Sequence, residues 1–195
     1  MSTDECRAVD ALTRQSEQSN KRCVSFENAC PNCLCEEYSV GIGSPGPINS
    51  EERLTRFHFS PLDFDLSGKL TTFAFSDVES IGLSITREQA SDEVMLAAIE
   101  RRLHLLEPDV VWHSVSVASA SAIRALTRTQ ENKAPERAFC VYDTAEPENV
   151  QHAEVMQTKA GRKLRSELRK QFGAVLRSEY RSGRLHPCQP QVTKP

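Results

Sequence analysis

Four short segments in the central part of the chain have the pattern of β-strands. Residues 54–59 alternate between polar and apolar side chains, and this period of two predicts a strand whose Phe57 and Phe59 point inward. The other three segments combine apolar residues with β-branched or aromatic ones, which favours strands that are at least half buried. These segments are residues 81–86, 110–117 and 138–142.

Two further segments have helical spacing. From Ser91 onward, apolar residues recur every three or four positions as far as Leu106, and Pro108 ends the pattern. Ser91 is suited to cap the first turn, because its side-chain oxygen can accept a hydrogen bond from an unpaired helix amide. Residues 118–126 predict a second, short helix. The order strand, strand, helix, strand, helix, strand predicts an α+β fold with a small mixed β-sheet and flanking helices.

The two ends of the chain differ from this central part. Residues 1–47 lack apolar periodicity and close with a run of Gly and Pro, which predicts a mostly irregular, cysteine-containing tail before a core domain over residues 48–157. Residues 158–184 place an apolar stripe opposite a basic one and predict an amphipathic basic C-terminal helix. We expect residues 185–195 to form a flexible tail.

Composition and charge narrow the class of protein. The 195 residues are 38% apolar and 26% charged, as in a globular protein with polar extensions. No apolar run approaches the roughly 18–20 residues that cross a bilayer, and the N-terminus has no basic and apolar leader. We therefore expect a cytoplasmic protein with no membrane role. The net charge of -3 conceals an uneven distribution, because residues 158–195 hold ten Lys or Arg against two Glu.

The basic C-terminal segment suggests one class of function. A cationic helix on an otherwise acidic chain predicts an accessory or interaction protein that docks through this helix. A protein partner with an acidic surface is favoured over nucleic acid, because no aromatic platform or known reading motif accompanies the positive charge. The alternative is that the apolar stripe simply packs on the chain's own core. The pattern does not specify an oligomeric state.

Seven cysteines suggest a second candidate site. Cys23, Cys30, Cys33 and Cys35 fall within thirteen residues and include one C-x-x-C pair, a spacing typical of zinc ligands. A reversible redox role, or no role, are the alternatives. Because a reducing compartment is expected, metal or redox chemistry is favoured here over a disulfide framework.

A third candidate site lies in residues 143–154, which we expect to form an acidic loop after the last strand. Catalytic groups often occupy loops that leave strand ends. His152 and Glu154 have the chemistry of an acid/base pair. The alternative is a surface histidine at the entry to the C-terminal helix.

Polar residues on the first two strands extend this candidate site. The order Arg56, Ser84 with Thr86, then Glu154 resembles the Arg-Ser-Glu layout of arginine-type ADP-ribosyltransferases. That resemblance implies an Arg that holds dinucleotide phosphates, a Ser that orders the site and a Glu that stabilises an oxocarbenium-like ribose. The Glu or Gln that the family places two residues before its Glu is absent, since His152 stands there.

Together these residues define an alternative function, a small nucleotide- or NAD-using transferase or hydrolase. Arg56 and Arg87 would hold an anion, Ser84 would orient the substrate, His152 would act as acid or base, and Glu154 would stabilise positive charge. Because no complete catalytic set is evident, the interaction protein is the leading prediction.

Overall fold

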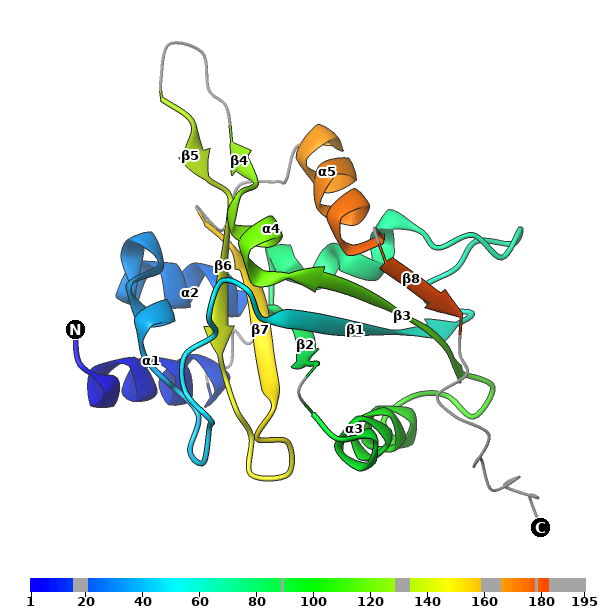
Figure 1. The fold of residues 1–195 in the computed structure, drawn as a ribbon, viewed down its shortest axis with the longest axis horizontal. Helices are drawn as coiled ribbons and strands as arrows, with labels where there is room; N and C mark the ends of the chain where they lie inside the picture. The colour runs from blue at the N-terminus through cyan, green and yellow to red at the C-terminus, as the bar shows by residue number, and fades with distance from the viewer. Residues whose placement is uncertain (16–20, 89, 129–133, 159–165, 178, 183–195) are drawn as a thin grey trace.

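The computed structural model describes most of the 195-residue chain and confirms the α+β class (Figure 1). Its main sheet has six strands in the order β6-β7-β2-β1-β3-β8, and β4 and β5 form a separate two-stranded sheet. Every ladder of the described part is antiparallel, so the expected mixed sheet is instead an antiparallel one. The residues described are 1–15, 21–88, 90–128, 134–158, 166–177 and 179–182.

The bounds of the strands and helices are as follows. The strands are β1 (Arg53–Ser60), β2 (Leu83–Arg87), β3 (Val111–Ser119), β4 (Thr127–Arg128), β5 (Glu136–Arg137), β6 (Phe139–Asp143), β7 (His152–Gln157) and β8 (Glu179–Ser182). The α-helices are α1 (Thr3–Gln15), α2 (Arg22–Ala29), α3 (Asp92–His104), α4 (Ala120–Arg124) and α5 (Ser166–Arg177). Two 3-10 segments are η2 (Pro31–Glu37) and η3 (Thr72–Glu79). No helix among these described residues is both long and apolar enough to cross a membrane.

The predicted central elements are confirmed with small changes at their ends. Strands β1, β2, β3 and β6 and helices α3 and α4 occupy the segments that the apolar pattern marked. Ser91 caps α3 as expected, since its Oγ accepts a hydrogen bond from the Val94 amide at 3.4 Å. Ser119 caps α4 in the same way, through the Ala122 amide at 3.1 Å.

One face of the sheet carries the main apolar core. Alternate residues of β2, β6 and β7 point to this face, where they pack against η3, α4 and α5. Phe172 of α5 stacks on Phe139 of β6 with ring centroids 4.5 Å apart and meets Phe75 of η3 edge-on. Burial of these rings accounts for the position of α5, because a helix is held mainly by its apolar face.

The opposite face is covered by two separate pieces. Over β6 and β7 lies the N-terminal unit of α1, α2 and η2, where Phe26 contacts Tyr142 with ring centroids 4.6 Å apart. Over β1 and β3 lies α3, which packs Ile99 against Phe59 and Val110. Figure 1 shows α1 and α2 on the left beside β6, and α3 at the lower right below β3. Strand β2 lies between these two pieces, and its Ser84 is exposed on this face.

The N-terminal unit contradicts the expectation of an irregular tail over residues 1–47. Its contacts to the sheet include a disulfide between Cys33 and Cys140, and a second disulfide joins Cys6 to Cys35 within the unit. The buried face of α1 combines Cys6 and the partly buried Val9 with the polar Asp10 and Thr13, so its apolar stripe is short and interrupted. These helices are held by tertiary contacts and cross-links, which local periodicity does not reveal.

The C-terminal region also differs from the prediction. Within the described residues, the helix expected over residues 158–184 appears as α5, and Glu179–Ser182 instead form β8. This strand pairs with the edge of β3 from Val117↔Glu179 to Ser114↔Ser182. An open sheet edge offers unpaired backbone groups, and a strand can satisfy them where a longer helix cannot. The predicted tail over residues 185–195 lies outside the described residues.

Candidate active site

A cleft of about 540 Å³ opens on the partly covered face of the sheet. Its floor is formed by β1, β2 and β7. Its sides are formed by α3, by the end of α1 and by the start of α2. Four of the five residues that the sequence proposed for catalysis and anion binding line this cleft together. They are Arg56, Ser84, His152 and Glu154. His152 and Glu154 lie on strand β7, not on the loop where they were expected.

The centre of the cleft is a hydrogen bond between Ser84 and His152. Strands β2 and β7 are paired with Ser84 opposite Glu154 and Thr86 opposite His152, so Ser84 and His152 are diagonal neighbours on one face. The Ser84 Oγ lies 2.8 Å from the His152 Nε2. Ser84 is exposed in the cleft, whereas only 6% of His152 is exposed. The hydroxyl is therefore accessible to a ligand, while its partner is held in place.

The other nitrogen of His152 fixes the ring. Its Nδ1 lies 3.1 Å from the backbone oxygen of Thr144 and 3.0 Å from the hydroxyl of the same residue. A carbonyl oxygen can only accept, so the hydrogen-bond network assigns the proton to Nδ1 and leaves the lone pair of Nε2 facing Ser84. The carboxylate of Glu146 lies 3.8 Å from Nδ1. His152 is thus oriented to accept a proton from the Ser84 hydroxyl.

Arg56 borders this pair where two strands separate. The ladder between β1 and β2 consists of Leu54↔Arg87 and Thr55↔Thr86, and beyond it the Arg56 Nη1 donates to the Ser84 backbone oxygen at 3.0 Å. Burial lowers the pKa of Arg56 from its ordinary value, although Asp63 and Asp77 act in the opposite direction. In the described part of the chain no carboxylate forms an ion pair with this guanidinium.

Glu154 is occupied by arginines of the N-terminal unit. Arg22 donates to Glu154 through Nη1 and to Asp10 through Nη2, while Arg14 lies 3.7 Å from the other Glu154 oxygen. Burial by itself raises the pKa of Glu154, but the charges of Arg22, His152 and Arg14 outweigh it and lower the pKa. Glu154 therefore remains a carboxylate that holds α1 and α2 at the side of the cleft.

Gly82 makes this close packing feasible at the start of β2. Its φ of +93° is one that side chains rarely adopt. A Cβ there would lie 3.2 Å from the Met156 Cε and 3.4 Å from the Arg22 Nη1. A larger residue would thus disturb both the backbone of β2 and the arginine that reaches Glu154.

Arg87, the fifth of these residues, lies outside the cleft, contrary to its expected role as an anion holder. It follows Ser84 by three positions and so points to the other face of the sheet. There it forms a buried ion pair with Glu52 and donates to the Gly46 backbone oxygen at 2.7 Å. Arg87 thus fixes the segment that leads into β1 and has no free donor edge toward the cleft.

Four cleft arginines were not expected from the sequence. Arg14 and Arg22 come from the unit that was expected to be irregular, and Arg101 and Arg102 come from the last turn of α3. For Arg101 and Arg102 the sequence does contain a signal, because basic residues cluster in the last turn of the predicted helix. No comparable pattern marks the other two.

The predicted four-cysteine zinc site is not assembled in this structure. Cys33 is joined to Cys140 and Cys35 to Cys6, while Cys23 and Cys30 are buried free thiols. Burial raises the pKa of Cys23 to about 12, which keeps its thiol protonated at neutral pH. The disulfides also contradict the expectation that these residues would not form a cross-linked framework.

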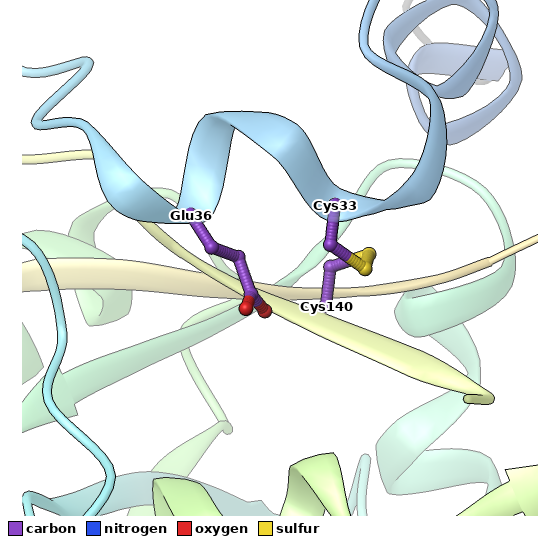
Figure 2. Close-up of side chains that lie close together, drawn as sticks. All are labelled: Cys33, Glu36 and Cys140. Atoms are coloured by element: carbon purple, nitrogen blue, oxygen red, sulfur yellow. A yellow bond between two sulfur atoms is a disulfide. The ribbon is translucent and has the colours of Figure 1, made fainter.

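A different trio of metal-ligand types does come together. Figure 2 shows Cys33, Glu36 and Cys140, whose ligand atoms lie within 4.8 Å of one another. Both sulfur atoms belong to the disulfide, and the Glu36 carboxylate already accepts from the Val141 amide and from Arg137 at 2.5 Å. Zinc binding therefore stays a prediction for the reduced protein only.

Helix α5 uses its apolar stripe for packing, the alternative to docking that the sequence left open. Leu168, Phe172 and Leu176 are buried in the main core. On the basic side, Arg169 is paired with Glu79 and Lys170 is exposed. Arg181 belongs to β8 instead, and nothing is described of its side chain or of the side chain of Arg177. The other basic positions of the predicted helix lie outside the described residues. Docking on an acidic partner through this helix stays a prediction.

Comparisons with known proteins give no relative to this chain. It matches no protein-family model, and neither the curated proteins nor the solved structures contain a significant match. The functional argument therefore rests on the chemistry of the cleft.

Proposed function

We propose that the protein is a hydrolase or acyl transferase in which Ser84 is the nucleophile and His152 the general base. The observation that carries this proposal is the 2.8 Å contact between the Ser84 Oγ and the His152 Nε2 at an accessible point of the cleft. A serine hydroxyl is a weak nucleophile by itself, and an adjacent base that is oriented by a third group activates it. Thr144 is that third group.

The geometry supports a two-step reaction on an ester. Ser84 Oγ bonds to the carbonyl carbon as its proton passes to His152 Nε2, and the alcohol leaves when the imidazolium returns that proton to it. Water then attacks the acyl-serine, again giving a proton to His152, and the carboxylic acid departs as Ser84 recovers its proton. The net reaction adds one water to one ester, and an alcohol in place of water makes the protein a transferase.

The contacts of Glu154 fit this chemistry better than they fit ribosyl transfer. Glu146 lies 3.8 Å from the His152 Nδ1, but Arg14 and Arg101 lie 3.3 and 3.9 Å from the same carboxylate, so we assign no charge role to it. Glu154 is already paired with two arginines, which weakens its effect on a developing positive charge. We therefore assign Ser84 a covalent role and Glu154 a positioning role, and no longer favour the ribosyltransferase-like assignment.

A fluorophosphonate probe tests this proposal, because it reacts covalently with activated serines. We expect a single adduct on Ser84 in the intact protein, identified by peptide mass spectrometry, and hydrolysis of p-nitrophenyl acetate at the same site. Ser84→Ala should abolish the adduct, and His152→Asn should slow it by about 10²–10⁴-fold, the usual range for a general base. Hydrolysis that is unchanged in Ser84→Ala would refute the assignment.

Thr86 offers a matched control for these variants. It lies on β2 two residues from Ser84, points to the same face and lines the same cleft. Thr86→Val removes a hydroxyl there without touching the bond between Ser84 and His152. Labelling of Ser84 should persist in this variant, and its loss would indicate that any change in β2 disturbs the reaction.

A further inference from the structure

The charges that line the cleft are unbalanced. Five arginines face three acids, namely Asp77, Glu146 and Glu154. Arg14 and Arg22 are engaged by Asp10 and Glu154. Arg101 donates to the Glu148 backbone oxygen at 2.7 Å and lies 3.9 Å from Glu146. The two arginines left without an acidic partner in the described structure are Arg56 and Arg102.

Arg56 is the more unusual of the two because its half-buried side chain has no ion pair with any described residue. Its Nε is buried with no hydrogen-bond partner, and among the described residues its Nη atoms reach the backbone oxygens of Ser84 and Ala74. A guanidinium in this state has lost part of its hydration without gaining a direct counter-ion, although Asp63 and Asp77 favour its charge from a distance. A bound anion would supply both the charge and the missing acceptors.

Arg102 approaches the same space from α3. It is exposed, lines the cleft, and exerts a repulsion on Arg56 that contributes to the lowered pKa of that residue. Two like charges that border one cleft without an anion between them repel each other. An anion placed between them would be attracted by both and would relieve that repulsion.

We propose that the cleft holds a phosphate group between Arg56 and Arg102, so that the substrate is an ester that also carries a phosphate. Neither arginine forms an ion pair within the described structure, and two such positive charges match a dianionic phosphate better than a carboxylate with one charge. Arginine also binds phosphate through paired donors. The identity of the reacting bond rests on the function proposed above. The phosphate site itself does not, because neither arginine takes part in the proton transfer.

Isothermal titration of inorganic phosphate into the intact protein tests this site. We expect saturable binding that weakens as salt rises, since the contact is ionic. Arg102→Gln should weaken binding at least tenfold, and because Arg102 is exposed this variant is expected to fold. Lys170→Gln is the matched control, since it removes one exposed positive charge on α5, which packs on the opposite face of the sheet. It should leave binding unchanged.

Further arms separate the outcomes. Ser84→Ala should bind phosphate as the unaltered protein does, so binding together with an unreactive Ser84 would overturn the proposed reaction alone. A reactive Ser84 with no phosphate binding would overturn the phosphate site alone. Acetate that binds as tightly as phosphate, or equal affinities in Arg102→Gln and Lys170→Gln, would also overturn the phosphate site.

Discussion

Two serine–histidine pairs occur in the main sheet, and they differ in access rather than in geometry. The Ser84 Oγ lies 2.8 Å from the His152 Nε2, and the Ser116 Oγ lies 2.7 Å from the His58 Nε2. Ser116 and His58 are both 0% exposed, whereas Ser84 opens into a cleft. A hydrogen bond of suitable length thus occurs at both places, but a substrate can reach only one of them.

The buried pair even has an acidic neighbour of the kind that a catalytic triad needs. Asp63 lies 3.8 Å from the His58 Nδ1, but its carboxylate is used by the Phe59 amide at 2.8 Å, and that Nδ1 has no hydrogen-bond partner. His58 also meets the edge of Phe75, with ring centroids 5.6 Å apart. Its surroundings therefore favour a neutral, structural histidine. Accessibility and surrounding charge, more than the contact itself, distinguish a candidate site from a core hydrogen bond.

The largest expected effect on the cleft, and on the stability of the protein, comes from breaking the disulfide between Cys33 and Cys140. It spans 107 positions and ties the N-terminal unit to β6. Replacing both residues by Ser should lower the free energy of unfolding by about 2–5 kcal/mol, as expected for a bond that closes a long loop. The same change should reduce Ser84 labelling, because Arg22 and Arg14 reach the cleft from this unit.

Urea unfolding followed by tryptophan fluorescence measures the stability, and the fluorophosphonate adduct measures the cleft. The unaltered protein treated with a reducing agent is the matched comparison. An unfolding midpoint that neither reduction nor the double replacement shifts would show that the N-terminal unit is held without this bond.

A smaller effect should separate the two serines directly. Ser116→Ala removes the buried partner of His58 and should destabilise the protein by about 1–3 kcal/mol, the usual cost of leaving a buried polar group unpaired. Ser84→Ala should change stability by less than about 0.5 kcal/mol, because the cleft admits water to His152. Urea unfolding compares the two variants, and equal losses of stability would contradict the distinction between a structural and a functional pair.

The sequence predicted the elements whose burial follows a simple period. Helix α3 is an example, since Ile99 and Leu103 share the face that packs on the sheet. Strand β1 was also predicted from its period of two, but both of its faces are buried, with Leu54 and His58 on one and Phe59 on the other.

Strand β7 carries the same signal, with Ala153 and Val155 in the core and His152 and Glu154 on the other face. The polar residues before this segment favour a loop, which is what the sequence predicts there. The period of two continues through residue 157, however, and it marks His152 and Glu154 as residues of a strand.

The N-terminal unit could not be predicted in this way. The face of α1 that it buries has helical spacing, but that spacing is carried largely by polar residues such as Asp10 and Thr13. Its position depends on a cross-link to Cys140, and the pairing of seven cysteines cannot be deduced from one sequence. The residues that this unit brings to the cleft, Arg14 and Arg22, were consequently missed. Arg56, Ser84, His152 and Glu154 were proposed from their residue types and their order along the chain, and they come together because β1, β2 and β7 are neighbours in the sheet.

The smallest expected effect is a pH dependence that belongs to the buried pair. Burial lowers the pKa of His58 below its ordinary value of about 6.5. Below that pH the unfolded chain binds a proton that the folded protein does not. The free energy of unfolding therefore decreases as the pH is lowered, until the pH reaches the lowered pKa of the folded state. This histidine alone adds a slope of up to about 1.4 kcal/mol per pH unit in that window.

His58→Gln should remove this part of the slope, although it lowers stability at pH 7.5. Urea unfolding at pH 7.5 and 5.5 gives the change in free energy between the two conditions for each variant. His104→Gln is the matched control, because His104 is exposed at the end of α3. The control should keep the slope of the unaltered protein. If His58→Gln kept it as well, the acid sensitivity would belong to other groups, and His58 would not be neutral in the folded state because of its burial.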